Sequence, residues 1–317
     1  MGGWLACRAA GQFSTKYGKI DDMVVSLEAV LPLGEIIRSK TIPKSSTGPQ
    51  IDRLLLGSEG TLGVITEATL KIWPKPEKRE LESYAFPDLK NGLESIRRIL
   101  RNDIYPACIR LYDQSETSRH FPDVKNAKGK CMLILVMEGT NELVELEKTV
   151  TQKTCIQEGG VSCGADPVHH WLDTRFNVKE ISEFLPRDVI FDTIEVSVMW
   201  DKSITLYNTM KSAIESVEGV ILASAHASHF YPQGVCFYFT FGGMNIKNEP
   251  NEFYNNVWAS AMEACLESGG SISHHHGIGL LRSPWLEKEL GTSHNVLRKI
   301  KETLDPKNIM NPGKMGL

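Results

Sequence analysis

Apolar and polar positions alternate in two stretches near the amino-terminal end of the sequence. Apolar residues, many of them β-branched, recur over residues 24–31 and 35–37, on both sides of a short turn at residues 32–34 that contains proline and glycine. This arrangement predicts a β-hairpin. Residues 63–73 alternate in the same way and predict another strand.

Pro74 and Pro76 follow that strand, and two prolines within three residues cannot continue a sheet or a helix, so we place a domain boundary there. Beyond the boundary, segments with helical spacing alternate with short apolar segments. The expected helices span residues 89–100, 142–157, 204–217 and 252–268, and the expected strands span residues 107–112, 132–137, 193–198, 220–225 and 235–241. The last helix should end at Gly269 and Gly270. A sheet interleaved with helices, without a glycine-rich phosphate loop, predicts an α+β fold with helices on one face of the sheet.

Composition narrows the classes of protein. The 317 residues include 41% hydrophobic and 23% charged residues, which is ordinary for a soluble protein of two packed units. The net charge of -4, without a cluster of basic residues, argues against a nucleic-acid partner. The seven cysteines are odd in number and include no C-x-x-C pair, so we expect reduced thiols in an intracellular protein and neither a disulfide framework nor a zinc site. No apolar segment approaches the ~20 residues that span a bilayer.

The segment Gly-Ser-Glu-Gly-Thr-Leu-Gly-Val-Ile at residues 57–65 offers backbone N–H groups, a hydroxyl and a carboxylate on a turn that leads into a strand. Such a turn suits a diphosphate or the edge of a heterocycle. A plain glycine turn before a strand explains the same residues equally well.

Three adjacent histidines, His274 to His276, lie between glycines in Ser-Ile-Ser-His-His-His-Gly-Ile-Gly at residues 271–279. Imidazoles titrate near neutral pH, so the loop suggests proton transfer. A metal site is the rival interpretation. We disfavour it because adjacent histidines in a loop seldom all face one ion, and no carboxylate follows at helical spacing. At least one of the three imidazoles should serve to orient another.

Tyr238 and Arg110, both in predicted strands, are further candidates for functional residues. Tyr238 lies in an aromatic alternating strand, where a core role is the commoner one. His226 and His229 precede it and are more typical of hydrogen-bonded filling residues. Arg110 is a charge inside an apolar strand, and it needs an anionic partner there, either a protein carboxylate or a ligand's phosphate or carboxylate.

The Gly-Gly-Trp segment at residues 2–4 and the segments at residues 17–22, 57–66 and 304–314 resemble the vanillyl-alcohol oxidase / p-cresol methylhydroxylase family of flavoproteins. The resemblance implies that residues 1–76 form the latter part of a PCMH-type FAD-binding domain. Residues 77–317 would form an FAD-linked oxidase C-terminal cap domain with an antiparallel sheet, in which residues 270–317 return toward the flavin. Because Met1 leads directly into a glycine-bounded turn, we expect the amino-terminal part of the FAD domain to be missing from this chain.

Within that family the chain is most similar to the alkylglycerone-phosphate (alkyldihydroxyacetonephosphate) synthases. The similarity rests on the triple-histidine loop, on residues 45–51, on Arg110 in Ile-Arg-Leu-x-Asp and on Tyr238. It implies ether-lipid synthesis: a net redox-neutral exchange of the acyl group of acyl-dihydroxyacetone phosphate for a long-chain fatty alcohol. It leaves open a homodimer, peripheral membrane contact, and a compartment that is peroxisomal in eukaryotes and cytoplasmic or membrane-peripheral in prokaryotes.

The same resemblance assigns roles to single residues. FAD, bound non-covalently and without a metal, would be held by Cys7, Arg8, Ala9, Ala10, Glu59, Gly60, Thr61, Leu62, Gly63, Val64 and Ile65. Tyr238 and His274, His275 and His276 would transfer protons, and Arg110 and Lys179 would bind the substrate phosphate. Lys179 stands where the synthases carry an arginine, which keeps the charge but loses the bidentate fork.

Two other functions stay open. Related flavin-dependent 2-hydroxyacid dehydrogenases and oxidases, of the glycolate and D-lactate type, generally show Glu-His-Gly in place of the triple-histidine loop. A catalytically inactive binding or interaction module is the alternative from another class, because half of the cofactor site is expected to be missing.

Overall fold

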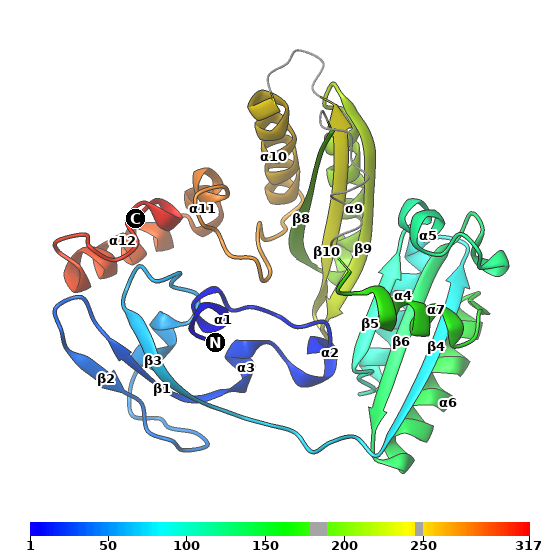
Figure 1. Cartoon of the computed structure of the whole chain (residues 1–317), viewed down its shortest axis with the longest axis horizontal. Coiled ribbons are helices and arrows are strands. Elements are labelled where there is room, and N and C mark those ends of the chain that lie inside the picture. Colours follow the sequence, from blue (N-terminus) through cyan, green and yellow to red (C-terminus); the bar gives the residue numbers. More distant parts are fainter. Residues whose placement is uncertain (178–188, 245–249) are drawn as a thin grey trace. The chain divides into compact units, whose positions relative to one another are not determined.

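The computed structural model describes residues 1–177, 189–244 and 250–317 and divides into two compact units (Figure 1). The first unit comprises Met1–Gly11, Tyr17–Pro74 and Ile272–Leu317, and the second comprises Gln12–Lys16 and Lys75–Ser271. Within the described residues, no helix is both long enough and apolar enough to cross a bilayer.

The first unit is built on a three-stranded antiparallel sheet ordered β2-β1-β3. Its elements are α1 (Gly2–Cys7), α3 (Ile20–Met23), β1 (Val24–Val30), β2 (Ile36–Arg38), η1 (Ile51–Leu55), β3 (Val64–Leu70), α11 (Ser283–Leu290), α12 (Thr292–Leu304) and η4 (Lys314–Gly316). The predicted hairpin is confirmed, since Val30 pairs with Ile36. The strand expected over residues 63–73 is shorter than predicted and ends at Leu70.

The second unit is built on a seven-stranded antiparallel sheet ordered β7-β4-β6-β5-β9-β10-β8. Its elements are α2 (Ser14–Tyr17, whose last residue belongs to the first unit), β4 (Lys78–Phe86), α4 (Leu89–Arg101), β5 (Cys108–Tyr112), α5 (Gln114–His120), η2 (Lys125–Ala127), β6 (Cys131–Gly139), α6 (Asn141–Gln157), β7 (Val161–Ser162), α7 (Asp166–Thr174), β8 (Val189–Met199), η3 (Trp200–Lys202), α9 (Ser203–Glu215), β9 (Val220–Phe230), β10 (Gly234–Met244) and α10 (Pro250–Glu267). Every helix and strand predicted beyond the double proline is found, and the α+β fold with an antiparallel sheet is confirmed. β4, β7, α5 and α7 have no predicted counterpart.

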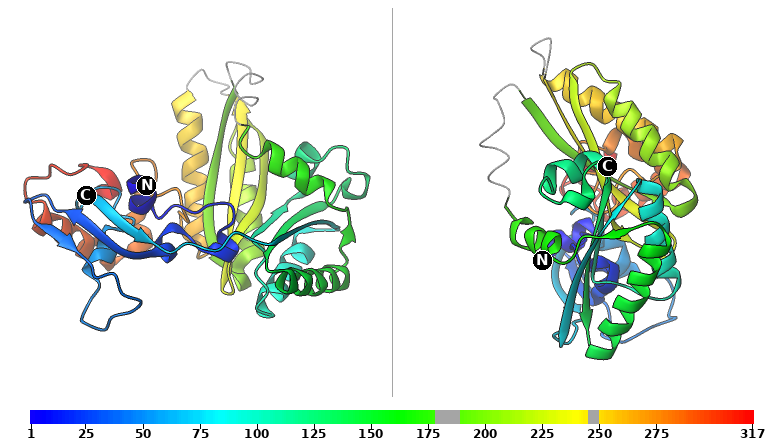
Figure 2. Two further views of the ribbon diagram at one scale, coloured as in Figure 1. Left: turned by 60° about the horizontal axis from the view of Figure 1, so that its bottom comes forward. Right: turned by 90° about the vertical axis from the view of Figure 1, so that its right-hand side faces the viewer.

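The sheet of the second unit has two unlike faces. In the antiparallel register Ala227 lies opposite Leu111 and Phe237, which point to one face. The α9 residue Tyr207 packs against Phe237 and Phe239 on that face, with ring centroids 5.9 and 6.1 Å apart. Helix α9 packs against β9 and β10, and α10 packs against α9 and β8 (Figure 2). Full burial of each phenylalanine stabilises this unit by about 1.5–3 kcal/mol.

The other face is polar where β5, β9 and β10 meet. His226 lies opposite Tyr112 and Tyr238 in the register, so the three side chains share this face. On this sheet α5 packs against β5, β6 and β9, and α7 packs against β4 and β6, with Trp171 of α7 in the same apolar cluster as Tyr112. Polar side chains of β5, β9, β10 and α5 form a hydrogen-bonded network on this face.

Candidate functional site

The turn at residues 57–63 is held against the first helix of its unit. Gly57, Glu59 and Gly60 have φ angles of 81°, 51° and 77°, in the left-handed region. The N–H of Gly57 donates to the carbonyl oxygen of Leu5 at 3.1 Å, and the N–H of Glu59 donates to that of Ala6 at 2.9 Å. The two segments that the sequence assigned to one cofactor, residues 7–10 and 59–65, are therefore brought together within the first unit.

Glu59 joins this turn to the histidine loop. Its carboxylate accepts hydrogen bonds from the backbone N–H groups of Ile278 at 2.5 Å and Gly279 at 2.7 Å. Gly277 has a φ of 83°, and a Cβ atom there would lie 2.7 Å from a Glu59 carboxylate oxygen. The glycine is needed both for the backbone conformation and for this close approach.

The turn's own polar groups are largely engaged inside the unit. The Thr61 N–H donates to the carbonyl oxygen of Ser58 at 2.9 Å, and the Thr61 carbonyl accepts from the buried ammonium of Lys301 at 2.9 Å. Asn311 donates through Nδ2 to the carbonyl oxygen of Glu59 at 2.5 Å. Glu59 and Thr61 thus shape the turn, while the guanidinium of the exposed Arg8 packs at Gly57.

The three histidines lie together within the first unit. The Nδ1 atoms of His274 and His275 are 3.0 Å apart, and the ring centroids of His275 and His276 are 4.4 Å apart. A contact between two Nδ1 atoms requires one to carry a proton and the other to accept it. The buried Arg282 supports the loop by donating to the Ser273 hydroxyl at 3.2 Å and to the Gly277 carbonyl at 2.7 Å. One of these two imidazoles therefore donates its Nδ1 proton to the other, on a loop whose backbone Arg282 supports.

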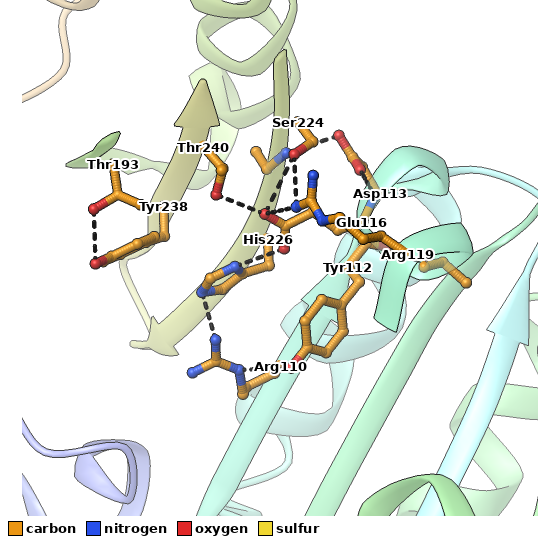
Figure 3. A network of polar contacts seen from close by, with 12 residues as sticks. Arg110, Tyr112, Asp113, Glu116, Arg119, Thr193, Ser224, His226, Tyr238 and Thr240 are labelled. Atoms are coloured by element: carbon orange, nitrogen blue, oxygen red, sulfur yellow. Dashed lines mark hydrogen bonds and ion pairs between the residues drawn. The ribbon is translucent and has the colours of Figure 1, made fainter. Parts of the chain in front are cut away.

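Arg110 belongs to a network of polar side chains in the second unit (Figure 3). Its Nε donates to the hydroxyl of Tyr112 at 3.1 Å, and its Nη2 contacts Nε2 of His226 at 2.6 Å. The rings of Tyr112 and Trp171 each lie 5.5 Å from the guanidinium carbon. Within the described ranges, no carboxylate forms an ion pair with this half-buried arginine. The protein carboxylate considered from the sequence is thus replaced by neutral acceptors and aromatic rings.

Glu116, on α5, contacts the side of the His226 ring that does not contact Arg110. The Nδ1 atom of His226 contacts a Glu116 carboxylate oxygen at 2.8 Å, and Thr240 donates to the other oxygen at 2.9 Å. Asp113 caps α5 by accepting from the Glu116 N–H at 2.8 Å, and its second oxygen accepts from the Ala225 N–H at 2.9 Å. This cap fixes the helix on β9 and aims Glu116 at His226.

Burial and charge set the protonation states in this cluster. Burial, together with the positive charge of Arg110, lowers the pKa of His226 to about 4. Burial alone would raise the pKa of Glu116, but the contact with His226 and the charge of Arg119 outweigh it and lower that pKa. At neutral pH the histidine is therefore an uncharged bridge between an arginine and a carboxylate.

Tyr238 stacks on His226, with ring centroids 5.0 Å apart and an interplanar angle of 18°. Its hydroxyl accepts a hydrogen bond from Thr193 at 3.0 Å. Burial raises the pKa of this half-buried hydroxyl above its ordinary value, so it keeps its proton at neutral pH and is a weaker acid than an exposed tyrosine.

Sequence reasoning missed Glu116 and left His226 as a filling residue. The signal was present as Asp113-x-x-Glu116 directly after an apolar strand, which is typical of a helix amino terminus. Lys179 lies outside the described residues, so the structure does not place the substituted arginine position.

Comparison with known proteins identifies two families that match the chain. Residues 75–315 match the family described as FAD linked oxidases, C-terminal domain, and residues 1–40 match the family described as FAD binding domain. The chain is 32% identical to alkyldihydroxyacetonephosphate synthase of Caenorhabditis elegans, over 98% of this chain and 57% of that protein. It is also 32% identical to the uncharacterized FAD-linked oxidoreductase YgcU of Escherichia coli strain K12, over 99% of this chain and 67% of that protein.

A solved structure of alkyldihydroxyacetonephosphate synthase superimposes with a TM-score of 0.76 at 28% identity, covering 98% of this chain and 58% of the other. p-Cresol methylhydroxylase shares the fold, with a TM-score of 0.69 at 15% identity over 98% of this chain and 68% of the other. The chain spans less than two thirds of the length of the synthases it matches.

Proposed function

Because this chain belongs to the family of FAD linked oxidases, we propose that it is part of an FAD-dependent enzyme of the alkyldihydroxyacetonephosphate synthase type. The reaction would exchange the acyl group of acyl-dihydroxyacetone phosphate for a long-chain fatty alcohol, releasing a fatty acid, without net redox change. The observation that carries the proposal is the histidine loop, in which each imidazole contacts the next along the chain and the backbone is hydrogen-bonded to Glu59.

The residues of the first unit fit part of an FAD site. The turn at residues 57–63 is joined to α1 by backbone hydrogen bonds, and the exposed Arg8, directly after α1, adds a cation beside Gly57 that suits a diphosphate. Residues 8–10, Gly60 and residues 62–65 would hold the cofactor, with Glu59 and Thr61 behind them. When bound non-covalently, FAD supplies the reactive ring system, and the protein supplies binding, orientation and proton transfer.

The chain's own residues divide the remaining work. His274, His275 and His276 would move the proton on the ketose carbon, since the shared Nδ1 contact gives neighbouring donor and acceptor atoms. Tyr238 would act as a proton donor or acceptor through its hydroxyl, which is hydrogen-bonded to Thr193. Arg110 would bind the phosphate end of the substrate, because its guanidinium lacks a carboxylate among the described residues and retains N–H donors beyond its two neutral acceptors.

A flavin-dependent 2-hydroxyacid dehydrogenase is the second candidate, because the E. coli oxidoreductase is as similar as the synthases and a glycolate oxidase subunit of Bacillus subtilis is 26% identical. The two differ in net electron transfer. The protein is incubated with FAD, acyl-dihydroxyacetone phosphate and labelled fatty alcohol. We expect equal amounts of ether product and fatty acid, with the flavin still oxidised. Bleaching of the flavin by glycolate or D-lactate, without ether product, would establish the dehydrogenase instead.

An inactive binding module is the third candidate. Gel filtration after incubation with FAD distinguishes it, because a module without a cofactor site elutes colourless. A variant with alanine at His275 and His276 is the matched control, since it should retain the yellow flavin and lose the ether product.

A further inference from the structure

We propose that Glu116 and His226 are positioning residues for Arg110: through a neutral imidazole they aim its guanidinium while leaving its charge available to a substrate oxyanion. The inference rests on the proposed phosphate-binding role of Arg110. Neither residue is assigned a role by the sequence motifs, and both lie on the polar face of the seven-stranded sheet (Figure 3).

The contacts determine the tautomer of His226. The Glu116 carboxylate can only accept a hydrogen bond, so Nδ1, 2.8 Å away, carries the ring proton. Nε2 then has a free lone pair, which accepts from Nη2 of Arg110 at 2.6 Å. The other tautomer would set an N–H against the guanidinium N–H and would leave the carboxylate without its donor. The carboxylate thus orients the arginine through the ring, as it does in carboxylate–histidine pairs that orient a metal.

The charges around His226 leave Arg110 uncompensated. Glu116 also pairs with Arg119 at 3.3 Å and accepts from Thr240, so its negative charge is shared with a second arginine. Asp113, the next carboxylate, accepts from Tyr207 at 2.9 Å and faces Lys211 at 4.0 Å. A direct carboxylate partner would balance the positive charge of Arg110. The neutral imidazole holds the guanidinium in place and leaves that charge unbalanced.

A purely structural role, in which His226 only helps to pack α5 on the sheet, predicts a different outcome. In that case, replacing His226 would lower the stability of the protein without altering its affinity for the ligand. His226→Phe keeps the ring that stacks on Tyr238 and lies 5.5 Å from the Tyr112 ring, and it removes both hydrogen bonds. His226→Gln restores one donor and one acceptor. His170→Phe changes an exposed histidine of the same unit outside this network and is the matched control.

The experiment measures thermal unfolding of the whole chain with and without dihydroxyacetone phosphate at constant ionic strength. We expect the wild type and His170→Phe to be stabilised equally. Arg110→Lys and His226→Phe should bind roughly tenfold or more weakly, and His226→Gln should recover part of the loss. If the wild type is not stabilised, or Arg110→Lys is stabilised like it, the phosphate role itself fails. If only Arg110→Lys loses affinity while His226→Phe keeps it, the positioning role fails.

A second readout covers the case in which His226→Phe does not fold. Long-range ¹H–¹⁵N correlations of the ¹⁵N-histidine-labelled wild type report which ring nitrogen carries the proton. We expect His226 to be protonated at Nδ1 alone at pH 7, and to lose that preference in Glu116→Gln together with affinity for dihydroxyacetone phosphate. Protonation at Nε2 in the wild type would overturn the inference.

Discussion

The carboxylate of Glu59 accepts the backbone N–H of Gly279 at 2.7 Å, across 220 positions of the sequence. The two most informative motifs of this chain are therefore parts of one structure within the first unit. A glutamate that the sequence suggested as a cofactor ligand serves to hold the backbone of the histidine loop, and this arrangement leads to the first prediction.

Glu59→Ala should lower the free energy of unfolding by about 1.5–3 kcal/mol, because hydrogen bonds to a charged acceptor are lost and two N–H groups are left to find new partners. Urea unfolding measures the change. The exposed Glu67→Ala on β3 is the matched control and should stay within about 0.5 kcal/mol of the wild type. Equal stability of both variants would show that the Glu59 contacts do not hold the loop.

His275→Ala and His276→Ala should each lower turnover by about two orders of magnitude or more in the FAD-loaded protein, which is the loss expected for a general acid or base. Ether formation is the measurement, with flavin retention as the control for folding. Near wild-type turnover in the double variant would remove the proton-transfer role.

Tyr238→Phe should preserve the fold, because the ring that stacks on His226 stays and only the hydroxyl bonded to Thr193 is lost. Activity should fall by about as much as in the histidine variants if this hydroxyl donates or accepts a proton in the reaction. Thermal unfolding and turnover are measured side by side. A loss of stability without a loss of rate would identify Tyr238 as a core residue.

Arg110→Lys should raise the substrate concentration required for turnover or abolish activity, because a point charge replaces a planar fork. Arg110→Ala should cost less stability than the roughly 3–5 kcal/mol expected when a buried ion pair is broken, since no carboxylate among the described residues would be stranded. Urea unfolding of the alanine variant checks this, and a loss of that full size would reveal a direct anionic partner within the protein.

The stability of the second unit should depend on pH through His226. Its pKa is about 4 in the folded protein against 6.5 when unperturbed, so between these values the unfolded chain binds the proton more readily. The contribution of uncharged His226 to the free energy of unfolding is complete above pH 6.5 and is lost as the pH falls toward 4. Arg110, Glu116, His120, Tyr112 and Tyr238 face this ring and enter the balance.

Urea unfolding at pH 7 and pH 5 tests that dependence. The wild type should lose more stability between the two values than His226→Phe, because the variant lacks the group that charges. An equal loss in both proteins would assign the pH dependence to other groups.

The sequence by itself determined the local elements and the residue types of the site. The hairpin between β1 and β2, and the helices α4, α6, α9 and α10, follow from periodicities that residues display among near neighbours. The glycine turn and the histidine loop were likewise evident from their own residues. β4, α5 and α7 were not, because the signals at their positions are short or are broken by charged residues.

Only the tertiary structure decided which of these residues act on one another. Glu59 meets Ile278 across 219 positions, and Glu116 meets His226 across 110. Both contacts depend on where a helix or a turn is docked and on the register of distant strands, which no local pattern encodes. The same reason applies to the partner of Arg110. The apolar strand around this arginine predicted a polar partner, but only the pairing of β5 with β9 brings the neutral His226 into contact with it.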